Sequence, residues 1–205
     1  STNAFSVLKL NSNLEYQWHT FLGNNSQFES AIAVDGSDNI YLTGSSSDWT
    51  GPGGERPIHA FRGIYYDIVV VKLSSTGTYQ YHTFYGNPNT DDIGVDIVID
   101  KNGVYVNGMS SGLWFGDDAA EPLHYAGSYN FSVLKLDLGL GYVWHTFYGE
   151  YLGSSSAITL DNSGNILVTG FTFYYWVGDN NTPPLNEFSG VVDIHVLKLS
   201  MDGDY

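Results

Sequence analysis

Phe5-Ser6-Val7-Leu8-Lys9-Leu10 is the first of four copies of one short apolar segment in this chain. The other copies begin at Ile68, Phe131 and Ile194, and each ends in Lys-Leu. Successive copies start 63 residues apart, and a fixed period of this size is typical of propellers and solenoid arrays. The chain is therefore predicted to be a repeat protein.

Two further blocks recur around these copies. Trp18-His19-Thr20-Phe21 returns at 81–84 and 144–147, and a block that ends in Thr-Gly or Asn-Gly occupies residues 31–44, 96–108 and 157–170. We expect one propeller segment over residues 1–205 that belongs to a larger propeller or repeat array. Its predicted units are residues 5–67, 68–130 and 131–193, with a partial unit at 194–205.

The blocks are short runs rich in Val, Ile, Tyr, Phe and Thr, separated by Gly, Asn, Asp and Ser. This composition is typical of β-strands, and no block shows apolar residues at helical spacing. The predicted fold class is all-β, with four antiparallel strands in each unit, which is the make-up of a propeller blade. The first strand of a blade carries small residues such as Ala31 and Ala33, so we expect it to be innermost.

The order of these blocks resembles the SBBP-type bacterial β-propeller repeat and, more distantly, the NHL repeat. The resemblance covers most of the chain: residues 31–44, 96–108 and 157–170, together with the four Lys-Leu segments. It implies a propeller in secreted or surface-exposed proteins, and a family without a common catalytic activity. The long loops after the Thr-Gly or Asn-Gly ends depart from the family pattern.

Charge excludes several classes of partner. The chain has 22 acidic and 7 basic residues, which gives a formal charge of −15, and such a surface repels nucleic acids and anionic lipids. It has no cysteine, so disulfides and thiol chemistry are excluded. No apolar run is long enough to span a membrane as a helix. We therefore expect no nucleic-acid binding and no membrane insertion.

Four lysines occupy one repeated strand position, and three aspartates end the first strand of the three units. A lysine inside a stack of sheets needs a partner or access to solvent, because a buried unpaired charge is costly. We expect each lysine to pair with a carboxylate or to extend to an edge. These residues are Lys9, Lys72, Lys135 and Lys198, and Asp35, Asp100 and Asp161.

The three long loops carry the candidate ligand-binding residues. In a propeller they lie on one rim, where an exposed tryptophan can stack on a sugar ring. The alternative is that each tryptophan anchors its own loop to the blade. Each loop contains one tryptophan and, further on, a motif of the type Pro-Ile-His whose last residue is also a candidate. In chain order these pairs are Trp49 and His59, Trp114 and His124, and Trp176 and Asn186.

Other candidates are structural or weakly specified. His19, His82 and His145 recur on the predicted outermost strand, where cross-strand hydrogen bonding with aromatic packing is a better interpretation than a metal site. Calcium is the one cofactor considered, at the turns after Asp35 and Asp161 and at the pairs Asp91-Asp92 and Asp117-Asp118, none of which has EF-hand spacing. Glycosylation sequons begin at Asn24, Asn130 and Asn180.

These observations favour a non-enzymatic extracellular or cell-surface module with a structural or adhesive role. Its expected partners are further repeats of the same chain or other copies of itself, joined by blade completion into a closed propeller, an oligomer or a filament. One alternative is a lectin-like propeller that binds surface glycans. The other is a polysaccharide-active enzyme, although no catalytic motif or catalytic residue is recognisable.

Overall fold

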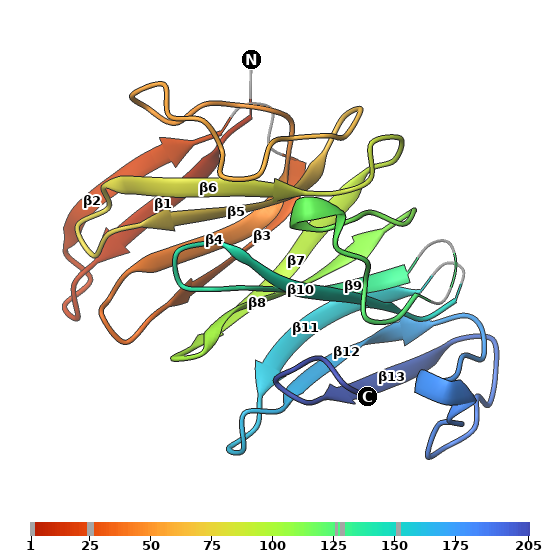
Figure 1. The fold of residues 1–205 in the computed structure, drawn as a ribbon. Coiled ribbons are helices and arrows are strands. Elements are labelled where there is room, and N and C mark those ends of the chain that lie inside the picture. Colours follow the sequence, from red (N-terminus) through yellow and green to blue (C-terminus); the bar gives the residue numbers. More distant parts are fainter. Residues whose placement is uncertain (1–2, 24–26, 126, 128–129, 151–152) are drawn as a thin grey trace.

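A computed structural model describes residues 3–23, 27–125, 127, 130–150 and 153–205. The described residues form thirteen β-strands and two short 3-10 turns, and contain no α-helix (Figure 1). The all-β prediction is confirmed. No helix among the described residues is long and apolar enough to cross a membrane.

The strands form four antiparallel sheets, which we name A to D in chain order (Figure 1). Sheet A is a hairpin of β1 (Phe5–Leu10) and β2 (Tyr16–Leu22). Sheet B contains β3 (Gln27–Val34), β4 (Ile40–Ser46), β5 (Asp67–Leu73) and β6 (Tyr79–Tyr85). Sheet C contains β7 (Asp92–Asp100), β8 (Gly103–Ser110), β9 (Asn130–Leu136) and β10 (Tyr142–Tyr148). Sheet D contains β11 (Ser154–Leu160), β12 (Ile166–Thr172) and β13 (Asp193–Leu199).

Sheets B and C follow the strand order that the sequence predicts. Each runs from first to fourth strand as neighbours, and each combines the end of one 63-residue unit with the start of the next. Sheet A supplies third and fourth strands, and sheet D supplies first, second and third strands. The 3-10 turns η1 (Asp117–Ala119) and η2 (Asp179–Asn181) lie in the long loops between second and third strands.

The turn that follows the third strand has the same left-handed position in all four sheets. One position takes a left-handed conformation with φ between 65° and 89°. Glycine occupies it at Gly77 and Gly203, and leucine occupies it at Leu14 and Leu140. Because this conformation is unfavourable for a residue with a Cβ atom, the two leucine turns carry a local cost. Leu140 is buried and offsets that cost by packing, whereas Leu14 is exposed.

Successive sheets stack face to face, with three apolar cores between them. We call the side of a sheet that points to the following sheet its forward face, and the other its rear face. In β5, Ile68 and Val70 lie on the forward face and Val69 and Val71 on the rear face. The core between B and C contains Ile68 and Val70, and the core between A and B contains Val69 and Val71. Each core defines one joint: A–B, B–C and C–D.

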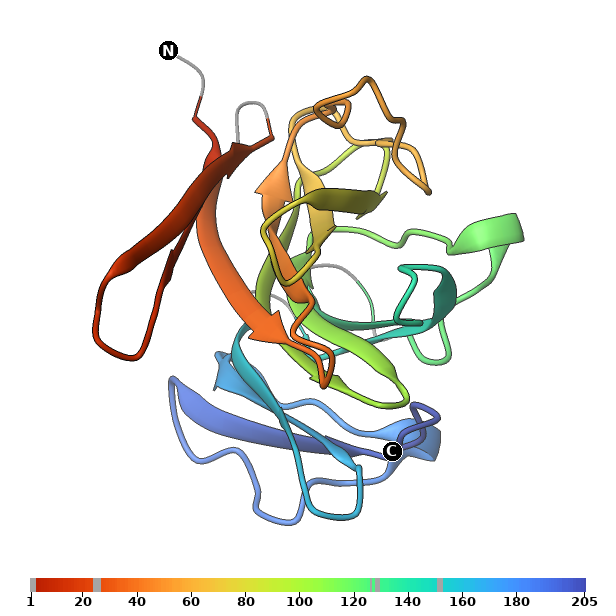
Figure 2. The ribbon, with the colours of Figure 1, turned by 90° about the vertical axis from the view of Figure 1, so that its left-hand side faces the viewer.

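The first strands bring the sheets together. β3 packs against β7, and β7 packs against β11. Ala31 and Ala33 of β3 pack into the B–C core, where their small side chains allow close approach. Figure 2 shows the succession from the red hairpin of sheet A to the blue strands of sheet D. The described residues establish a stack of four antiparallel sheets of two to four strands, and the propeller stays a prediction.

Candidate functional site

A recurring lysine contact ties each sheet to the next. The Nζ atoms of Lys9, Lys72 and Lys135 donate hydrogen bonds to backbone carbonyls at 3.0, 2.7 and 2.7 Å. Each acceptor is 66 residues further along the chain, in the turn that follows the third strand of the next sheet. The three acceptors are the carbonyl oxygens of Ser75, Leu138 and Met201.

These three lysines bind backbone carbonyls instead of the expected carboxylates, and only Lys9, which is exposed, fits the other expected outcome, extension to an edge. A carbonyl oxygen satisfies an ammonium group without adding a second buried charge. The expectation of a carboxylate partner is confirmed only for Lys198, whose Nζ lies 2.9 Å from Asp161 Oδ2 within sheet D. Hydrogen bonds from Asn165 and Lys198 hold the pKa of Asp161 below its usual range. Lys198 thus turns back to its own sheet, where no following turn is available among the described residues.

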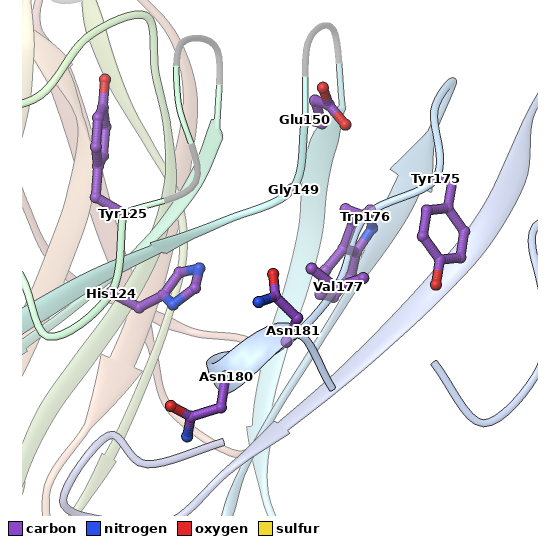
Figure 3. A pocket seen from close by; sticks show the side chains of 10 residues that line it. His124, Tyr125, Gly149, Glu150, Tyr175, Trp176, Val177, Asn180 and Asn181 are labelled. Carbon is purple, nitrogen blue, oxygen red and sulfur yellow. The ribbon is translucent and has the colours of Figure 1, made fainter. Parts of the chain in front are cut away.

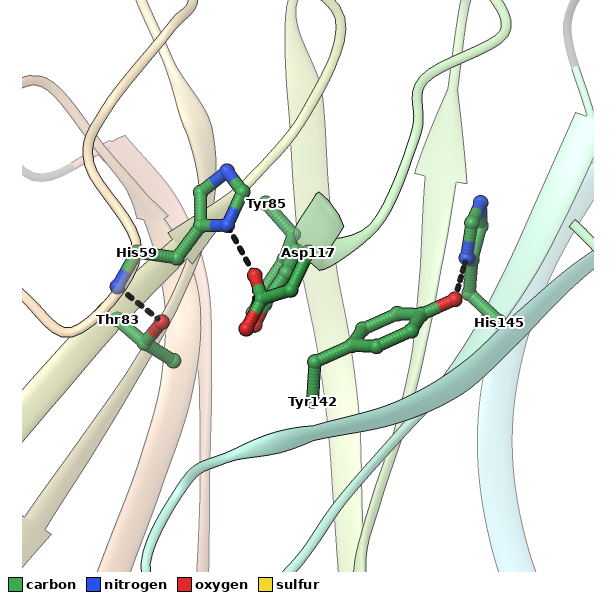
Figure 4. A network of polar contacts seen from close by, with 6 residues as sticks. All are labelled: His59, Thr83, Tyr85, Asp117, Tyr142 and His145. Carbon is green, nitrogen blue, oxygen red and sulfur yellow. Dashed lines mark hydrogen bonds and ion pairs between the residues drawn. The ribbon is translucent and has the colours of Figure 1, made fainter. Parts of the chain in front are cut away.

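A second recurring contact joins the outer loops at the B–C joint (Figure 4). His59 Nδ1 lies 2.5 Å from Asp117 Oδ1, and the Tyr85 hydroxyl donates to the same oxygen at 3.2 Å. His59 and Tyr85 belong to sheet B, whereas Asp117 belongs to the loop of sheet C. Burial and the neighbouring Asp117 raise the pKa of Tyr85, so its hydroxyl remains a donor. We call this trio the His–Tyr–Asp clasp.

The clasp is repeated at the C–D joint. His124 Nδ1 lies 2.8 Å from Asp179 Oδ1, and the Tyr148 hydroxyl donates to that oxygen at 2.9 Å. The imidazole of His124 stacks on the ring of Tyr148. His59 and His124 are therefore separate elements of two joints, and they do not come together as a ligand-binding pair. Asn186, their counterpart in the third loop, is exposed.

The A–B joint has no clasp among the described residues, because sheet A has no loop between second and third strands to supply the histidine, and the other two positions carry different residues. Leu22 occupies the position of the tyrosines, and Pro52 occupies the position of the aspartates. The loop around Pro52 keeps one backbone hydrogen bond of the other loops, because Gly51 N–H donates to Glu55 O as Gly116 N–H donates to Ala120 O, but it does not form their 3-10 turn. A hollow of about 530 Å³ lies here, lined in part by Leu22 and Pro52.

Two of the three loop tryptophans anchor their loops. Trp49 stacks on His82 with ring centroids 3.9 Å apart, and Trp114 stacks on His145 at 4.0 Å. Both tryptophans are buried, so the anchoring alternative holds for them and the sugar-platform prediction is wrong. A Cβ atom on Gly116 would overlap the ring of Tyr142, which explains the glycine of the Trp-x-Gly motif.

The fourth-strand histidines complete these anchors. His145 Nε2 faces the Trp114 carbonyl at 3.1 Å, so it carries the proton, and Nδ1 accepts from the Tyr142 hydroxyl at 2.7 Å (Figure 4). Burial lowers the pKa of His145 to about 4, which keeps the imidazole neutral. His82 makes the same contacts in sheet B. Aromatic packing is as expected, whereas the hydrogen bonds go to a loop and a nearby tyrosine instead of across strands. His19, in sheet A, is exposed.

Trp176 is the half-buried exception. It borders a hollow of about 420 Å³ with His124, Glu150 and Asn180 (Figure 3). In sheets B and C the equivalent tryptophan is covered by the histidine of the fourth strand, and sheet D has three strands among the described residues. The exposure of Trp176 therefore follows from the incomplete sheet.

The acidic turns satisfy themselves. Asp35 Oδ1 accepts the Ser37 and Asn39 amides, Asp100 accepts the Asn102 amide, and the Asp161 turn repeats the first pattern. Among the described residues, no group of three or more histidine or acidic side chains is arranged to hold a metal ion. The geometry therefore adds no support for calcium.

The Asp91-Asp92 pair also accepts hydrogen bonds from loop backbone amides. Asp91 Oδ1 accepts the Tyr66 amide at 3.2 Å, and Asp92 Oδ2 accepts the Asn87 amide at 2.6 Å. Burial raises the pKa of Asp92 well above its ordinary value. Asp67 Oδ2 accepts two amides of its own loop, and burial raises the pKa of this carboxyl too.

The three glycosylation candidates differ in accessibility. Asn130 is buried, and its side-chain amide donates to the Gly127 carbonyl, so the prediction for this residue is wrong. Asn180 is exposed in η2 and stays a candidate. Asn24 lies outside the described residues.

The two outer faces of the stack expose repeat positions that are buried inside it. On the forward face of D, Ile194 is 81% exposed, whereas its counterpart Ile68 is 0% exposed. On the rear face of A, Leu8 is 61% exposed, whereas Leu134 is 0% exposed. Both faces thus have the composition of a joint without the opposing sheet.

A third exposed position lies on the rear face of B. Ile32 of β3 is 57% exposed, and its counterpart Ile97 of β7 is 5% exposed. Ile97 is covered because sheet B has a first strand, whereas the described residues of sheet A form third and fourth strands only.

No family model matches the chain, and no curated protein matches it significantly. The resemblance to the SBBP-type repeat therefore stays a prediction, which rests on the motifs alone.

Proposed function

We propose that this chain is a non-enzymatic structural module of an extracellular or cell-surface protein, built of β-propeller blades that join further sheets of the same type. The observation that carries the proposal is the exposure of joint positions at both outer faces. Ile194 and Val196 on one face, and Leu8 and Leu10 on the other, occupy positions that are buried elsewhere. Burying such side chains stabilises by about 1.5–3 kcal/mol each, which is a strong drive to continue the stack.

The role of the outer faces is assembly, because the charged and aromatic side chains that recur in the long loops are engaged within the stack. The clasps and the stacked tryptophans hold sheets and loops together, and the side chains of one blade recur in the next. Catalysis needs dissimilar groups converging on one pocket, and repetition of a single set does not provide them.

A sugar-binding role is not favoured by the hollow beside Trp176. A fourth strand added to sheet D would cover this tryptophan as β6 and β10 cover Trp49 and Trp114. A ligand at this hollow would therefore compete with assembly.

Sedimentation velocity of the full chain tests the proposal. We expect concentration-dependent association, which the double substitution Ile194→Lys with Val196→Lys abolishes by placing charges on the forward face of D. Val143→Lys, at an exposed residue on the outer strand β10, is the control and should associate as the unmodified chain does. A chain that stays monomeric at its highest soluble concentration would overturn the proposal.

A further inference from the structure

We propose that two copies of this chain close into one ring of six sheets, in which sheet D of each copy and sheet A of the other form a single complete sheet. This inference rests on the proposed function and specifies its partner, which is a second copy. Sheet A supplies third and fourth strands and sheet D supplies first, second and third strands, so the two together contain every strand type. The third strand is present twice, in β13 and in β1, and one of them leaves the completed sheet.

The exposed rear face of sheet B supports completion over simple stacking. Ile32 and Val34 are exposed because sheet A, in the part of the chain that the structure describes, has no first strand to cover them. Stacking sheet D against sheet A of a partner would leave them exposed. Completion places β11 of one copy over β3 of the other, in the relation that β3 has to β7 and β7 has to β11.

The clasp provides an independent argument from the sequence. The residue that replaces its histidine is Asn186, the one that replaces its tyrosine is Leu22, and the one that replaces its aspartate is Pro52. In an open stack these three substitutions fall at two different places. After completion all three positions meet at one joint. This joint lies between the completed sheet, formed by D and the partner's sheet A, and sheet B of the partner. One joint of a different type then explains three departures from the repeat.

The sheets that two copies of residues 1–205 supply fit a closed ring. Each copy contributes sheets B and C and shares in two completed sheets, so two copies give six. Closed propellers have about four to eight blades. One copy would give three blades and three copies would give nine, and both lie outside this range.

The net charge of the chain makes dimer formation depend on ionic strength. Each copy carries a formal charge of −15, so two copies repel at long range. Salt screens this repulsion over about 10 Å at 0.1 M ionic strength. We expect the dimer to be favoured by added salt, because its joints are apolar.

Introduced cysteines test the arrangement directly, since the chain has none of its own. At the C–D joint the side chain of Asp96 accepts the Ile158 amide at 3.0 Å, so these repeat positions face each other across a joint. The corresponding pair at the proposed joint is Ala157 with Ile32 of the partner. The double variant A157C/I32C should therefore form an interchain disulfide, visible as a covalent dimer without reductant. The pair is the same whether β13 or β1 leaves the sheet.

The controls use the same repeat positions. A31C/I97C places the pair at the B–C joint and should form an intrachain disulfide, and A157C or I32C alone should give no covalent dimer. Native mass spectrometry of the unmodified chain should give a mass of two copies.

Each outcome decides something. A dimer that crosslinks at 32 and 157 supports the ring. Larger or open-ended assemblies, or a dimer without this crosslink while A31C/I97C forms its disulfide, overturn the ring and leave the proposed function standing. A monomer at all concentrations overturns both.

Discussion

Strands β5 and β13 occupy the same place in their sheets and meet opposite surroundings. Ile68, Val70 and Lys72 on the forward face of β5 lie against sheet C, whereas Ile194 and Val196 on β13 face solvent. Both strands pair with a second strand in the same register and end in equivalent turns. The sheet therefore forms from local pairing, and the opposing sheet adds burial and the lysine contact. Stability should depend on the joints.

The largest difference in unfolding free energy should come from one repeat position on the rear face, compared between sheets C and A. Leu134→Ala removes a buried side chain and should lower the free energy of unfolding by about 2–5 kcal/mol. Leu8→Ala, at the exposed copy, should cost less than about 1 kcal/mol in the monomer. Urea unfolding at low protein concentration measures both. Equal losses would mean that the joint adds nothing to this position.

Acid should weaken the inner sheets through the buried histidines. Burial lowers the pKa of His145 in the folded protein to about 4, against 6.5 for the exposed group. Between these values the unfolded chain binds a proton that the folded chain does not. The contribution of neutral His145 to the free energy of unfolding is therefore fully present above pH ~6.5. It is lost as the pH falls toward ~4, by up to about 3 kcal/mol.

His145→Gln should flatten this part of the stability profile, measured by urea unfolding at several pH values. His19→Gln, at the exposed copy of the same repeat position, is the matched control and should leave the profile of the unmodified chain. A slope unchanged by His145→Gln would show that the acid sensitivity arises elsewhere.

The lysine contact should matter inside the stack and little at its end. Lys135→Met removes a donor to the Met201 carbonyl from a nearly buried side chain, and should cost about 1–3 kcal/mol. Lys198→Met removes an exposed ion pair and should cost less than about 1 kcal/mol. The difference between the two unfolding free energies is the measured quantity, and a reversed order would contradict the role of the contact.

The clasp should show coupling across a joint. A double-mutant cycle of His59→Ala and Asp117→Ala should give a coupling free energy of about 1 kcal/mol. Either single change already removes the hydrogen bond between these two side chains, so the second change cannot remove it again. The same cycle on Asn186 and Pro52 should give none in the monomer. Additive effects at His59 and Asp117 would reduce the clasp to a packing contact.

The smallest expected effect is a gain in stability at one turn. Leu14→Gly relieves a left-handed backbone at φ 65° without losing burial, and should stabilise by up to about 1 kcal/mol. Leu140→Gly relieves the same strain and loses a core side chain, so it should destabilise. Two changes of the same sign would show that turn strain and packing are not separable here.

The sequence predicts the strands and their order well because both depend on local signals. Repeated apolar runs and turn residues fixed the four strand types, including small residues such as Ala31 at the close contact between sheets. The partners of the lysines were not predictable in the same way, since a turn carbonyl 66 residues away has no side-chain signature.

The clasp could have been found from the sequence. Asp117 and Asp179 each follow a Trp-x-Gly motif directly, and this shared offset marks them as one repeat position. Asp118 follows Asp117 directly, whereas Asn180 follows Asp179, so an acidic pair in one loop masks the equivalence of the two aspartates. The burial of Trp49 and Trp114 depends on contacts between a loop and the fourth strand, which composition does not encode.

The repeated lysines lie on the forward faces of their sheets. Each acceptor carbonyl lies in a turn of the following sheet. Bringing two forward faces together would oppose ammonium groups without acceptors, and bringing two rear faces together would leave the acceptors unused. The stack therefore has a direction, and copies that assemble through these faces are expected to join head to tail.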